Sequence, residues 1–304
     1  MENNAGRLAG ALNLKASGAH HWRGDCPACG YRGAFALSER EQRRALFWCA
    51  NCRDGSAILD ALKRRDIWSG SGVGSGAPDP TAIERIAERD RQRQERAARM
   101  SAIAARDWQA AKPITGTVGE RYLREVRGIR GTLPPSIRFS PAAVHSESGL
   151  RLPAVVCGAA CWPSRNVVAI HRTFLRSDGS GKAPVTPDRK TLGPVAGASI
   201  RLAPAAPAMA VGEGLETCLS VADATGLATW AAMFADNILA LALPDLPLAS
   251  DLVIAADHDE NGVGQKAAEA AAERWARQGR RVRIALPPRV GTDFNDMARA
   301  VAHV

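Results

Sequence analysis

The 304-residue sequence lacks three features that would each define a class of protein. It contains no run of eighteen apolar residues, the length that a membrane-spanning helix requires. No charged-then-apolar segment of the signal-peptide kind opens the chain, so we expect a cytoplasmic protein. No glycine-rich loop ending in Gly-Lys-Ser or Gly-Lys-Thr occurs, which excludes a motor ATPase of the phosphate-loop class within this chain.

Acidic residues are scarce in the middle of the chain and in excess near its end. Residues 1–112 carry 19 Lys and Arg against 13 Asp and Glu, residues 113–205 carry 13 against 5, and residues 206–304 carry 8 against 13. The basic parts suit a polyanion such as nucleic acid, and the acidic part suits bound metal ions. A chain of this length is expected to fold as two or three units.

Two strand-like apolar runs near the C-terminus end at acidic residues. Residues 209–211 lead to Glu213, residues 251–256 lead to Asp257 and Asp259, and a helical pattern follows each motif. Because ligands bind beyond the carboxyl ends of strands in an open α/β sheet, we expect these carboxylates to lie together. Neighbouring carboxylates repel by about 4 kcal/mol per pair at an effective dielectric near ~20. Their hard oxygen atoms suit Mg²⁺ or Mn²⁺.

An acid that follows a strand can instead serve only as a helix cap. This alternative is strongest for Asp293 and Asp296, because we expect Thr292 beside them to cap the final helix. It is weaker for the acids at 213, 257 and 259, which lie where a strand becomes a helix.

The acidic motifs resemble the Toprim domain, which primases, topoisomerases and some nucleases share. Its counterparts here are Glu-Gly at 213–214, Asp-x-Asp-x-x-Gly at 257–262 and the acidic segment 291–296. The stretches EGLET and AADHDENGVGQKAAEAAAERW are most similar to the primases of phages and mobile elements. The resemblance implies catalytic roles and magnesium binding for Glu213, Asp257 and Asp259, with Glu216, Asp293 and Asp296 as the candidates for holding a second magnesium ion.

The pattern of residues 206–304 predicts alternating strands and helices. We expect helices over 215–226 and 263–278, and strands over 228–233, 238–243 and 282–286. This alternation predicts a parallel sheet covered by helices on both faces.

Four cysteines near the N-terminus have the spacing of a structural zinc site. Cys26 and Cys29 form one Cys-x-x-Cys pair, and Cys49 and Cys52 form a second after nineteen residues. Disulfides are disfavoured in a cytoplasmic chain, and a redox Cys-x-x-Cys motif would not occur as a matched pair. Four thiolates at about 2.3 Å close a tetrahedral zinc shell. We therefore predict a zinc ribbon with strands near 35–37 and 45–48.

This ribbon resembles the zinc-binding domain of bacterial and phage primases, which implies contact with a single-stranded template. Aromatic and basic residues that could stack on bases and bind phosphates surround the cysteines: Trp22, Arg23, Tyr31, Arg32, Arg43, Arg44, Trp48 and Arg53. A small zinc module also needs aromatic residues for its core, and we expect Trp48, next to Cys49, to be of that kind.

The whole chain divides, by these patterns, into a zinc-ribbon DNA-binding domain at 1–68, a flexible Gly/Ser linker at 69–80, a charged helix at 81–112, a basic α+β subdomain at 113–205 and a Toprim catalytic domain at 206–304. Within the basic subdomain we expect a helix over 119–128 and strands over 152–157 and 167–175. Our candidates for nucleotide and template binding there are Arg172, Lys182 and Lys190, with simple solvent exposure as the alternative.

We expect a DNA primase that makes short RNA primers on single-stranded DNA from ribonucleoside triphosphates, with structural Zn²⁺ and catalytic Mg²⁺ or Mn²⁺. Glu213 is either a further metal ligand or the general base. Two alternatives stay open: a Toprim nuclease or nicking enzyme, and a non-catalytic DNA-binding accessory protein. Topoisomerase activity is disfavoured, since Tyr31 and Tyr122 are the only tyrosines. Because the chain has no phosphate loop, a replicative helicase would be a separate partner.

Overall fold

The computed structural model describes residues 5–40, 44–52, 54–68, 80–260 and 262–301. The chain forms two compact units, residues 1–89 and 90–304, which are described separately below. The predicted linker at 69–80 lies outside the described residues except for Pro80, which begins helix α3 (Pro80–Ala110). Within the described ranges, no helix combines the length and apolar character needed to cross a bilayer.

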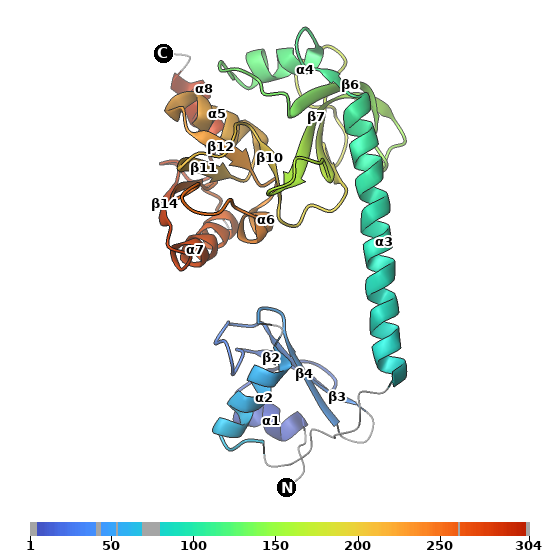
Figure 1. Cartoon of the computed structure of the whole chain (residues 1–304), viewed down its shortest axis with the longest axis vertical. Helices are drawn as coiled ribbons and strands as arrows, with labels where there is room; N and C mark the ends of the chain where they lie inside the picture. Colours follow the sequence, from blue (N-terminus) through green and yellow to red (C-terminus); the bar gives the residue numbers. More distant parts are fainter. Residues whose placement is uncertain (1–4, 41–43, 53, 69–79, 261, 302–304) are drawn as a thin grey trace. The chain divides into compact units, whose positions relative to one another are not determined.

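The first unit is a small antiparallel sheet with two helices (Figure 1). Its elements are α1 (Ala5–Ala11), β1 (Lys15–Gly18), β2 (His21–Gly24), β3 (Phe35–Arg40), β4 (Arg44–Cys49) and α2 (Gly55–Arg64). The strands pair in sequence order, so each neighbouring pair is a hairpin. The predicted strands lie within β3 and β4, whereas sequence patterns did not indicate α1, β1 or β2.

Helix α2 shows how this unit builds its core. Asp54 precedes the helix, and its Oδ1 accepts a hydrogen bond of 2.9 Å from the backbone N–H of Ala57, as an N-cap does. Ile58, Ala61 and Leu62 lie three and four residues apart, so they share one buried helix face. Ile58 and Leu62 pack in the same core as the two zinc-motif cysteines that are buried.

The second unit is organised around one ten-stranded sheet. Its elements after α3 are β5 (Lys112–Pro113), α4 (Val118–Arg121), the π-turn η2 (Tyr122–Val126), β6 (Ile137–Val144), β7 (Arg151–Cys161), β8 (Ala169–Phe174), β9 (Arg189–Leu192), β10 (Ala198–Arg201), β11 (Ala208–Gly212), α5 (Leu215–Thr225), β12 (Ala228–Ala231), α6 (Ala235–Ala240), β13 (Asp251–Ala255), α7 (Val263–Ala276), β14 (Arg281–Ala285) and α8 (Phe294–Val301). The strand order is β14-β13-β11-β12-β10-β7-β6-β5, and β8 pairs with both β7 and β9.

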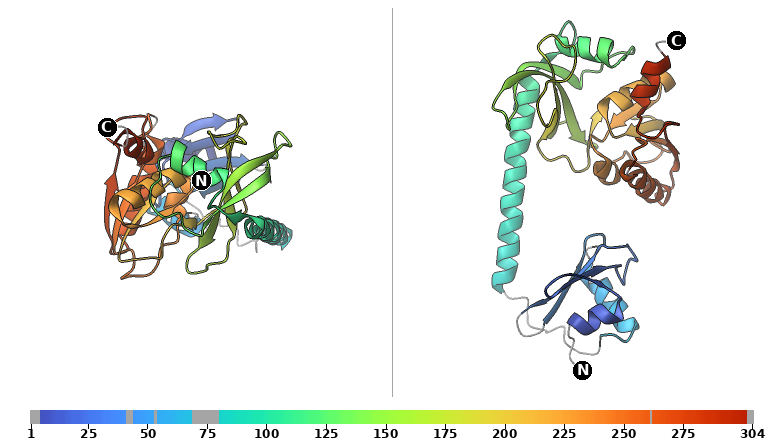
Figure 2. Two further views of the ribbon diagram at one scale, coloured as in Figure 1. Left: turned by 90° about the horizontal axis from the view of Figure 1, so that it is seen from above. Right: turned by 180° about the vertical axis from the view of Figure 1, so that it is seen from behind.

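Strands β14, β13, β11 and β12 pair in parallel, which confirms the predicted parallel sheet. Figures 1 and 2 show α5 and α8 on one face of these strands and α6 and α7 on the other. The side-chain alternation of β11 matches this arrangement: Met209 and Val211 pack in the cluster that contains Trp275 of α7, whereas Ala210 packs with Val221 of α5. Both faces of the sheet are therefore buried.

One predicted strand of this region is wrong. Residues 238–243 were expected to form a strand, but residues 235–240 form helix α6 and the next three residues are irregular. Within the helix, Ala235 and Ile238 are both buried and lie three residues apart, the spacing of one helix face. A short apolar run of this kind does not distinguish a strand from a helix.

The antiparallel half of the sheet holds the basic residues. The predicted strands at 152–157 and 167–175 correspond to β7 and β8, and β10 continues the sheet from β7 to the parallel strands. The predicted helix over 119–128 is α4 followed by η2, in which the Arg127 amide donates to the Tyr122 carbonyl at 3.0 Å. The end of α3 packs on this half, where the Arg138 guanidinium lies 3.9 Å from the centre of the Trp108 ring.

Candidate metal centres and active-site cavity

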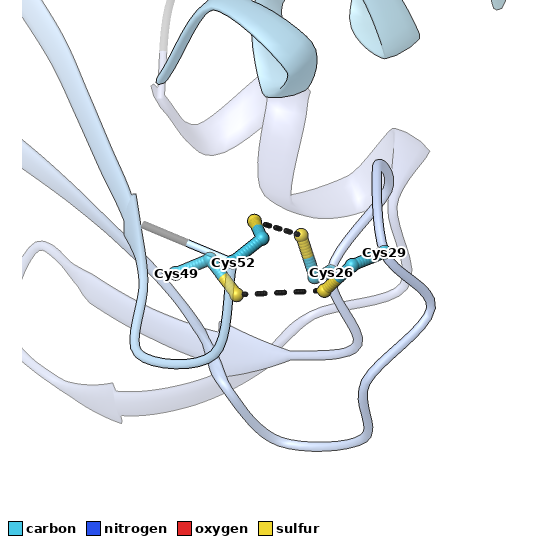
Figure 3. A group of neighbouring side chains, drawn as sticks. All are labelled: Cys26, Cys29, Cys49 and Cys52. Atoms are coloured by element: carbon cyan, nitrogen blue, oxygen red, sulfur yellow. Dashed lines mark hydrogen bonds between the residues drawn. The ribbon is translucent and has the colours of Figure 1, made fainter. Parts of the chain in front are cut away.

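The four cysteines of the first unit converge on one point (Figure 3). Their sulfur atoms all lie within 4.8 Å of one another, with Cys26 and Cys52 3.9 Å apart and Cys29 and Cys49 3.8 Å apart. A tetrahedral zinc ion with Zn–S bonds of about 2.3 Å requires sulfur atoms about 3.8 Å apart. The observed spacing therefore fits a closed Cys₄ zinc site, as predicted from the sequence.

Turn geometry positions the first Cys-x-x-Cys pair. The Gly30 amide donates to the Cys26 carbonyl at 2.9 Å, and Gly30 has a φ of 71°, a conformation that glycine adopts without strain. Asn51, beside the second pair, donates from Nδ2 to the sulfur of Cys29 at 3.5 Å. Although burial raises the pKa of Cys29, hydrogen bonds from Asn51 and the Tyr31 amide help to lower it to about 6, which favours the thiolate that zinc requires.

The outer face of the ribbon sheet carries an aromatic ring that we had expected in the core. Trp48 is 53% exposed. On β4 the side chains alternate, and because Phe47 and Cys49 point into the unit, Trp48 points outward. Trp48 pairs with Ala36, which pairs in turn with the exposed Arg23, so a basic residue lies two strands away from Trp48 on the same face of the sheet. Of the other residues named with it, Arg43 and Arg53 lie outside the described residues.

The second unit contains a cavity of about 530 Å³ at the carboxyl ends of the parallel strands. Its lining combines acidic, basic and neutral polar side chains: Arg127, His171, Pro187, Arg189, Lys190, Thr191, Glu213, Gly214, Glu216, Thr217, Met233, Phe234, Asp257 and Asp293. Strands β8 and β9 contribute to one side, and the ends of β11 and β13 contribute to the other.

Carboxylates from three strand or helix ends form the acidic side of this cavity. Glu213 follows β11, and burial together with the charge of Asp259 raises its pKa. Asp257 follows β13, and burial, reinforced by the charges of Glu213 and Asp293, raises its pKa from 3.8 to about 7. The Thr217 hydroxyl donates to Asp257 Oδ1 at 3.5 Å. Raised carboxylate pKa values mean that the ionised forms of these side chains are disfavoured in the folded protein, and a bound cation would stabilise those ionised forms.

These carboxylates fit an ion that keeps part of its water shell. Among the described residues, only the four cysteines bring three or more potential ligand atoms close enough to hold an ion directly. The acids are spaced more widely, and Asp259 is exposed beside the start of α7 without lining the cavity. Magnesium commonly binds through one or two carboxylates and several waters. Glu213 and Asp257 are therefore the residues best placed to hold it.

Glu216 differs from the other acids because it is buried and already bonded. It is 3% exposed, and its Oε1 accepts a hydrogen bond of 3.1 Å from the Tyr122 hydroxyl. Burial raises its pKa, but the positive charge of Arg127 and further favourable contacts hold that pKa below its usual value. Glu216 therefore stays ionised and links α5 to η2.

Asp293 and Asp296 form a reciprocal cap at the start of α8. The Asp296 amide donates to Asp293 Oδ1 at 2.8 Å, and the Asp293 amide donates to Asp296 Oδ2 at 3.3 Å. The expected cap, Thr292, instead donates its hydroxyl to the Arg289 carbonyl at 2.6 Å, so that prediction is wrong. Asp293 also lines the cavity, whereas Asp296 does not.

The three basic candidates are engaged in contacts within the subdomain. Arg172 donates to the Val144 carbonyl at 3.2 Å, and Lys182 pairs with Asp188 at 3.0 Å. Lys190 pairs with Glu147 and is the only one of the three that lines the cavity.

The structure adds residues that sequence reasoning did not select. Arg127 and Arg189 line the cavity and carry a charge opposite in sign to that of the acids. His171 lines the cavity as well. Arg127 follows η2, and its Nη2 lies 4.0 Å from Asp293 Oδ2. The sequence signal for Arg189 was its position next to Lys190 in one basic segment, of which only Lys190 is among our candidates for nucleotide binding.

Two family models match the second unit. Residues 208–303 match the Toprim domain, and residues 98–202 match a domain of unknown function, DUF7146. Residues 208–303 therefore form a Toprim domain, as the acidic motifs and the parallel sheet predicted. No curated protein matches the chain in sequence.

Several solved primase structures are similar to this chain at low sequence identity. A DNA primase domain from Pseudomonas aeruginosa is 16% identical over 66% of this chain and 74% of its own, with a TM-score of 0.44. The Aquifex aeolicus primase, comprising zinc-binding and RNA polymerase domains, is 14% identical over 96% and 78%, with a TM-score of 0.41. The primase fragment of the bacteriophage T7 primase-helicase is 14% identical over 92% and 95%, with a TM-score of 0.37.

Loss of one cysteine should remove zinc from the first unit. We expect one zinc ion per purified chain, and almost none in a Cys49→Ser variant, because three thiolates leave the tetrahedral shell open. Elemental analysis by mass spectrometry measures this directly. A Cys161→Ser variant, altered at a free cysteine outside the cluster, is the matched control and should keep its zinc. Metal-free native protein would contradict the zinc assignment.

Magnesium should stabilise the protein more at high pH than at low pH. The pKa of Asp257 is raised from 3.8 to about 7 by folding, so the folded state holds a proton that the unfolded state releases. Metal-free stability therefore falls as pH rises between these values and stays low above them. Calorimetry should show a larger increase in Tm with Mg²⁺ at about pH 8 than at about pH 5.

Replacement of Asp257 by asparagine should remove much of the pH dependence of metal-free stability. In the absence of metal at about pH 8, Asp257→Asn should raise the free energy of unfolding by ~1–2 kcal/mol, a figure reduced for partial solvent screening. Glu269→Gln, which alters an exposed acid of α7 away from the cavity, is the control. Equal responses of the two variants would show that the charge of Asp257 is not destabilised by burial and by the neighbouring carboxylates.

Proposed function

We propose that this protein is a DNA primase that synthesises short RNA primers on single-stranded DNA by divalent-metal-dependent nucleotidyl transfer. The observation that carries the proposal is the single cavity in which carboxylates of the Toprim domain share the lining with cations of the basic subdomain. A nucleoside triphosphate bound with a metal ion has matching needs, because carboxylates hold the metal and cations bind the phosphates.

Each side of the cavity has a distinct role in this proposal. Bound Mg²⁺ would activate the primer 3′-hydroxyl and stabilise the departing pyrophosphate. Glu213 and Asp257 would hold the metal, and the negative charge of Asp259, outside the cavity lining, acts on Glu213. As the alternative to holding the metal, Glu213 would accept the proton of the attacking hydroxyl, a role that its raised pKa favours.

The cationic side binds and orients the triphosphate. Arg127, Arg189 and Lys190 all line the cavity. Orientation of the α-phosphorus toward the attacking oxygen supplies much of the rate in phosphoryl chemistry. Arg172 and Lys182, which do not line the cavity, are proposed to contact the template instead.

The zinc ribbon supplies a second nucleic-acid contact. Trp48 and Tyr31 are 53% and 51% exposed, and Arg23 lies across the sheet from the strand that bears Trp48. Exposed rings stack on the bases of single strands, and nearby cations bind the backbone. We propose that this face binds the template.

The biological setting is proposed from motif similarity. The Glu-Gly-Leu-Glu-Thr segment at 213–217 and the Asp-His-Asp segment at 257–259 resemble primases of phages and mobile elements. We propose that the protein acts in replication of such an element, together with a separate helicase.

Primer synthesis should depend on Asp257. Incubation with single-stranded DNA, labelled ribonucleotides and Mg²⁺ or Mn²⁺ should yield short templated RNA, resolved by length on a gel. An Asp257→Ala variant should lose at least ~100-fold in rate, because a metal ligand is removed from the transition state. Glu269→Gln should retain the wild-type rate. Shortened DNA without RNA would establish the nuclease alternative, and unchanged synthesis by Asp257→Ala would remove this cavity from the mechanism.

Template binding should depend on the ring of Trp48. Removal of one stacking ring costs ~1–3 kcal/mol, so Trp48→Ala should weaken single-stranded DNA binding by about fivefold or more, as measured by fluorescence anisotropy. Leu46→Ala is a matched control, because Leu46 is exposed on the same strand and face but has no ring. Equal effects of the two changes would indicate a general apolar contact, and no effect would place the template elsewhere.

A further inference from the structure

His171 lines the cavity but belongs to neither its acidic nor its cationic side. It lies on β8 and is only 8% exposed. Its Nδ1 is buried, and neither ring nitrogen has a hydrogen-bond partner within the part of the chain that the structure describes. Because Nδ1 is inaccessible, Nε2 is the nitrogen that a ligand in the cavity can reach. A packed ring with one accessible, unused polar atom is a preorganised binding group.

A second neutral polar side chain lies beside it. Thr191 of β9 is directly opposite His171 in the antiparallel pair and also lines the cavity. Side chains in such a pair have Cβ atoms about 4.5–5.5 Å apart, close enough to contact one small ligand group. The cavity thus has a neutral polar part between residues that carry charge.

The charge of the ring limits what it can bind. Burial, together with the positive charges of Arg189, Lys182 and Arg172, lowers the pKa of His171 to about 4 against the opposing charge of Glu216. The ring is therefore neutral at physiological pH, and a neutral imidazole both donates and accepts hydrogen bonds. Phosphates bind better to the nearby cations and a metal ion binds better to the carboxylates, which leaves a neutral hydroxyl as the matching group.

We propose that Nε2 of His171, with the Thr191 hydroxyl beside it, hydrogen-bonds a sugar hydroxyl of the incoming nucleoside triphosphate. This inference rests on the proposed function and assigns the part of the substrate that the neutral residues bind. A sugar hydroxyl donates and accepts, as the neutral imidazole does. A nucleotide that lacks the hydroxyl would leave the imidazole unpaired, so the contact would distinguish ribonucleotides from their deoxy analogues.

The test is a binding cycle that needs no primer synthesis. Isothermal titration measures the Kd of the full chain with Mg²⁺ for ATP, 2′-deoxy-ATP and 3′-deoxy-ATP. The wild-type protein should bind one of the two analogues about fivefold to tenfold more weakly than ATP, the value of one neutral hydrogen bond. In His171→Ala that preference should disappear, because the variant and the analogue remove the two partners of the same contact. The analogue that loses its penalty identifies the hydroxyl.

Two further variants separate contact from folding. Thr173→Val alters a buried hydroxyl on the same strand that has no partner among the described residues and does not line the cavity, so it should keep the full preference for ATP. Thr191→Val changes a less buried position and should reduce the preference even if His171→Ala fails to fold. Loss of the preference in Thr173→Val as well would indicate general distortion and would contradict the proposal.

The remaining outcomes distinguish this inference from the proposed function. If wild-type protein binds ATP and both analogues equally, or if His171→Ala weakens all three to the same extent, the sugar contact is wrong while nucleotide binding stands. If wild-type protein binds none of the three, the proposed function and this inference fail together.

Discussion

The cavity depends on the compensation of one buried charge, the carboxylate of Glu216. Its charge lies in a nearly dry position on α5 and is compensated by Tyr122 and Arg127, which come from the two ends of η2. An i→i+5 turn brings residues five apart near one another, so the Tyr122 hydroxyl bonds the carboxylate while the positive charge of Arg127 acts on it from the same turn. Removing a partner from a buried charge is strongly destabilising. The hydrogen bond between Tyr122 and Glu216 therefore links the basic subdomain to the Toprim domain.

A second constraint is the continuity of the sheet. Strand β10 pairs antiparallel with β7 on one side and with β12 on the other, so the antiparallel and parallel halves form one surface. Parallel strands all end at the same edge of a sheet. Glu213 and Asp257, which follow β11 and β13, are therefore brought to the same edge although they are far apart in the sequence. The same continuity brings β8 and β9 to the cavity. Opposite charges thus line one space although they arise from segments far apart in the chain.

The elements recognised from sequence are those whose signals are local. The cysteine spacing predicted the zinc cluster, and the strand-to-helix transitions predicted the positions of Glu213 and Asp257. Arg127 was missed because its place depends on a π-turn, which has no simple periodicity, and His171 because its place depends on the pairing of β8 with β9. The error at Trp48 was avoidable, since strand alternation places it opposite the inward-facing Phe47. Helix α6 could not be distinguished from a strand in this way, because a short apolar run fits the periodicity of a helix and that of a strand equally well.

The cations of the basic subdomain differ in how readily they could bind a triphosphate. Lys190 is paired with Glu147, and Arg127 lies near Asp293, so each would exchange one anionic partner for another. Arg189 is 50% exposed and its nearest carboxylate, Asp188, is 3.8 Å away and itself paired with Lys182 at 3.0 Å. An exposed and shared ion pair contributes little stability. Arg189 is therefore the cavity cation whose ion pair contributes least, and under the proposed function it would lose least when a phosphate replaces its partner.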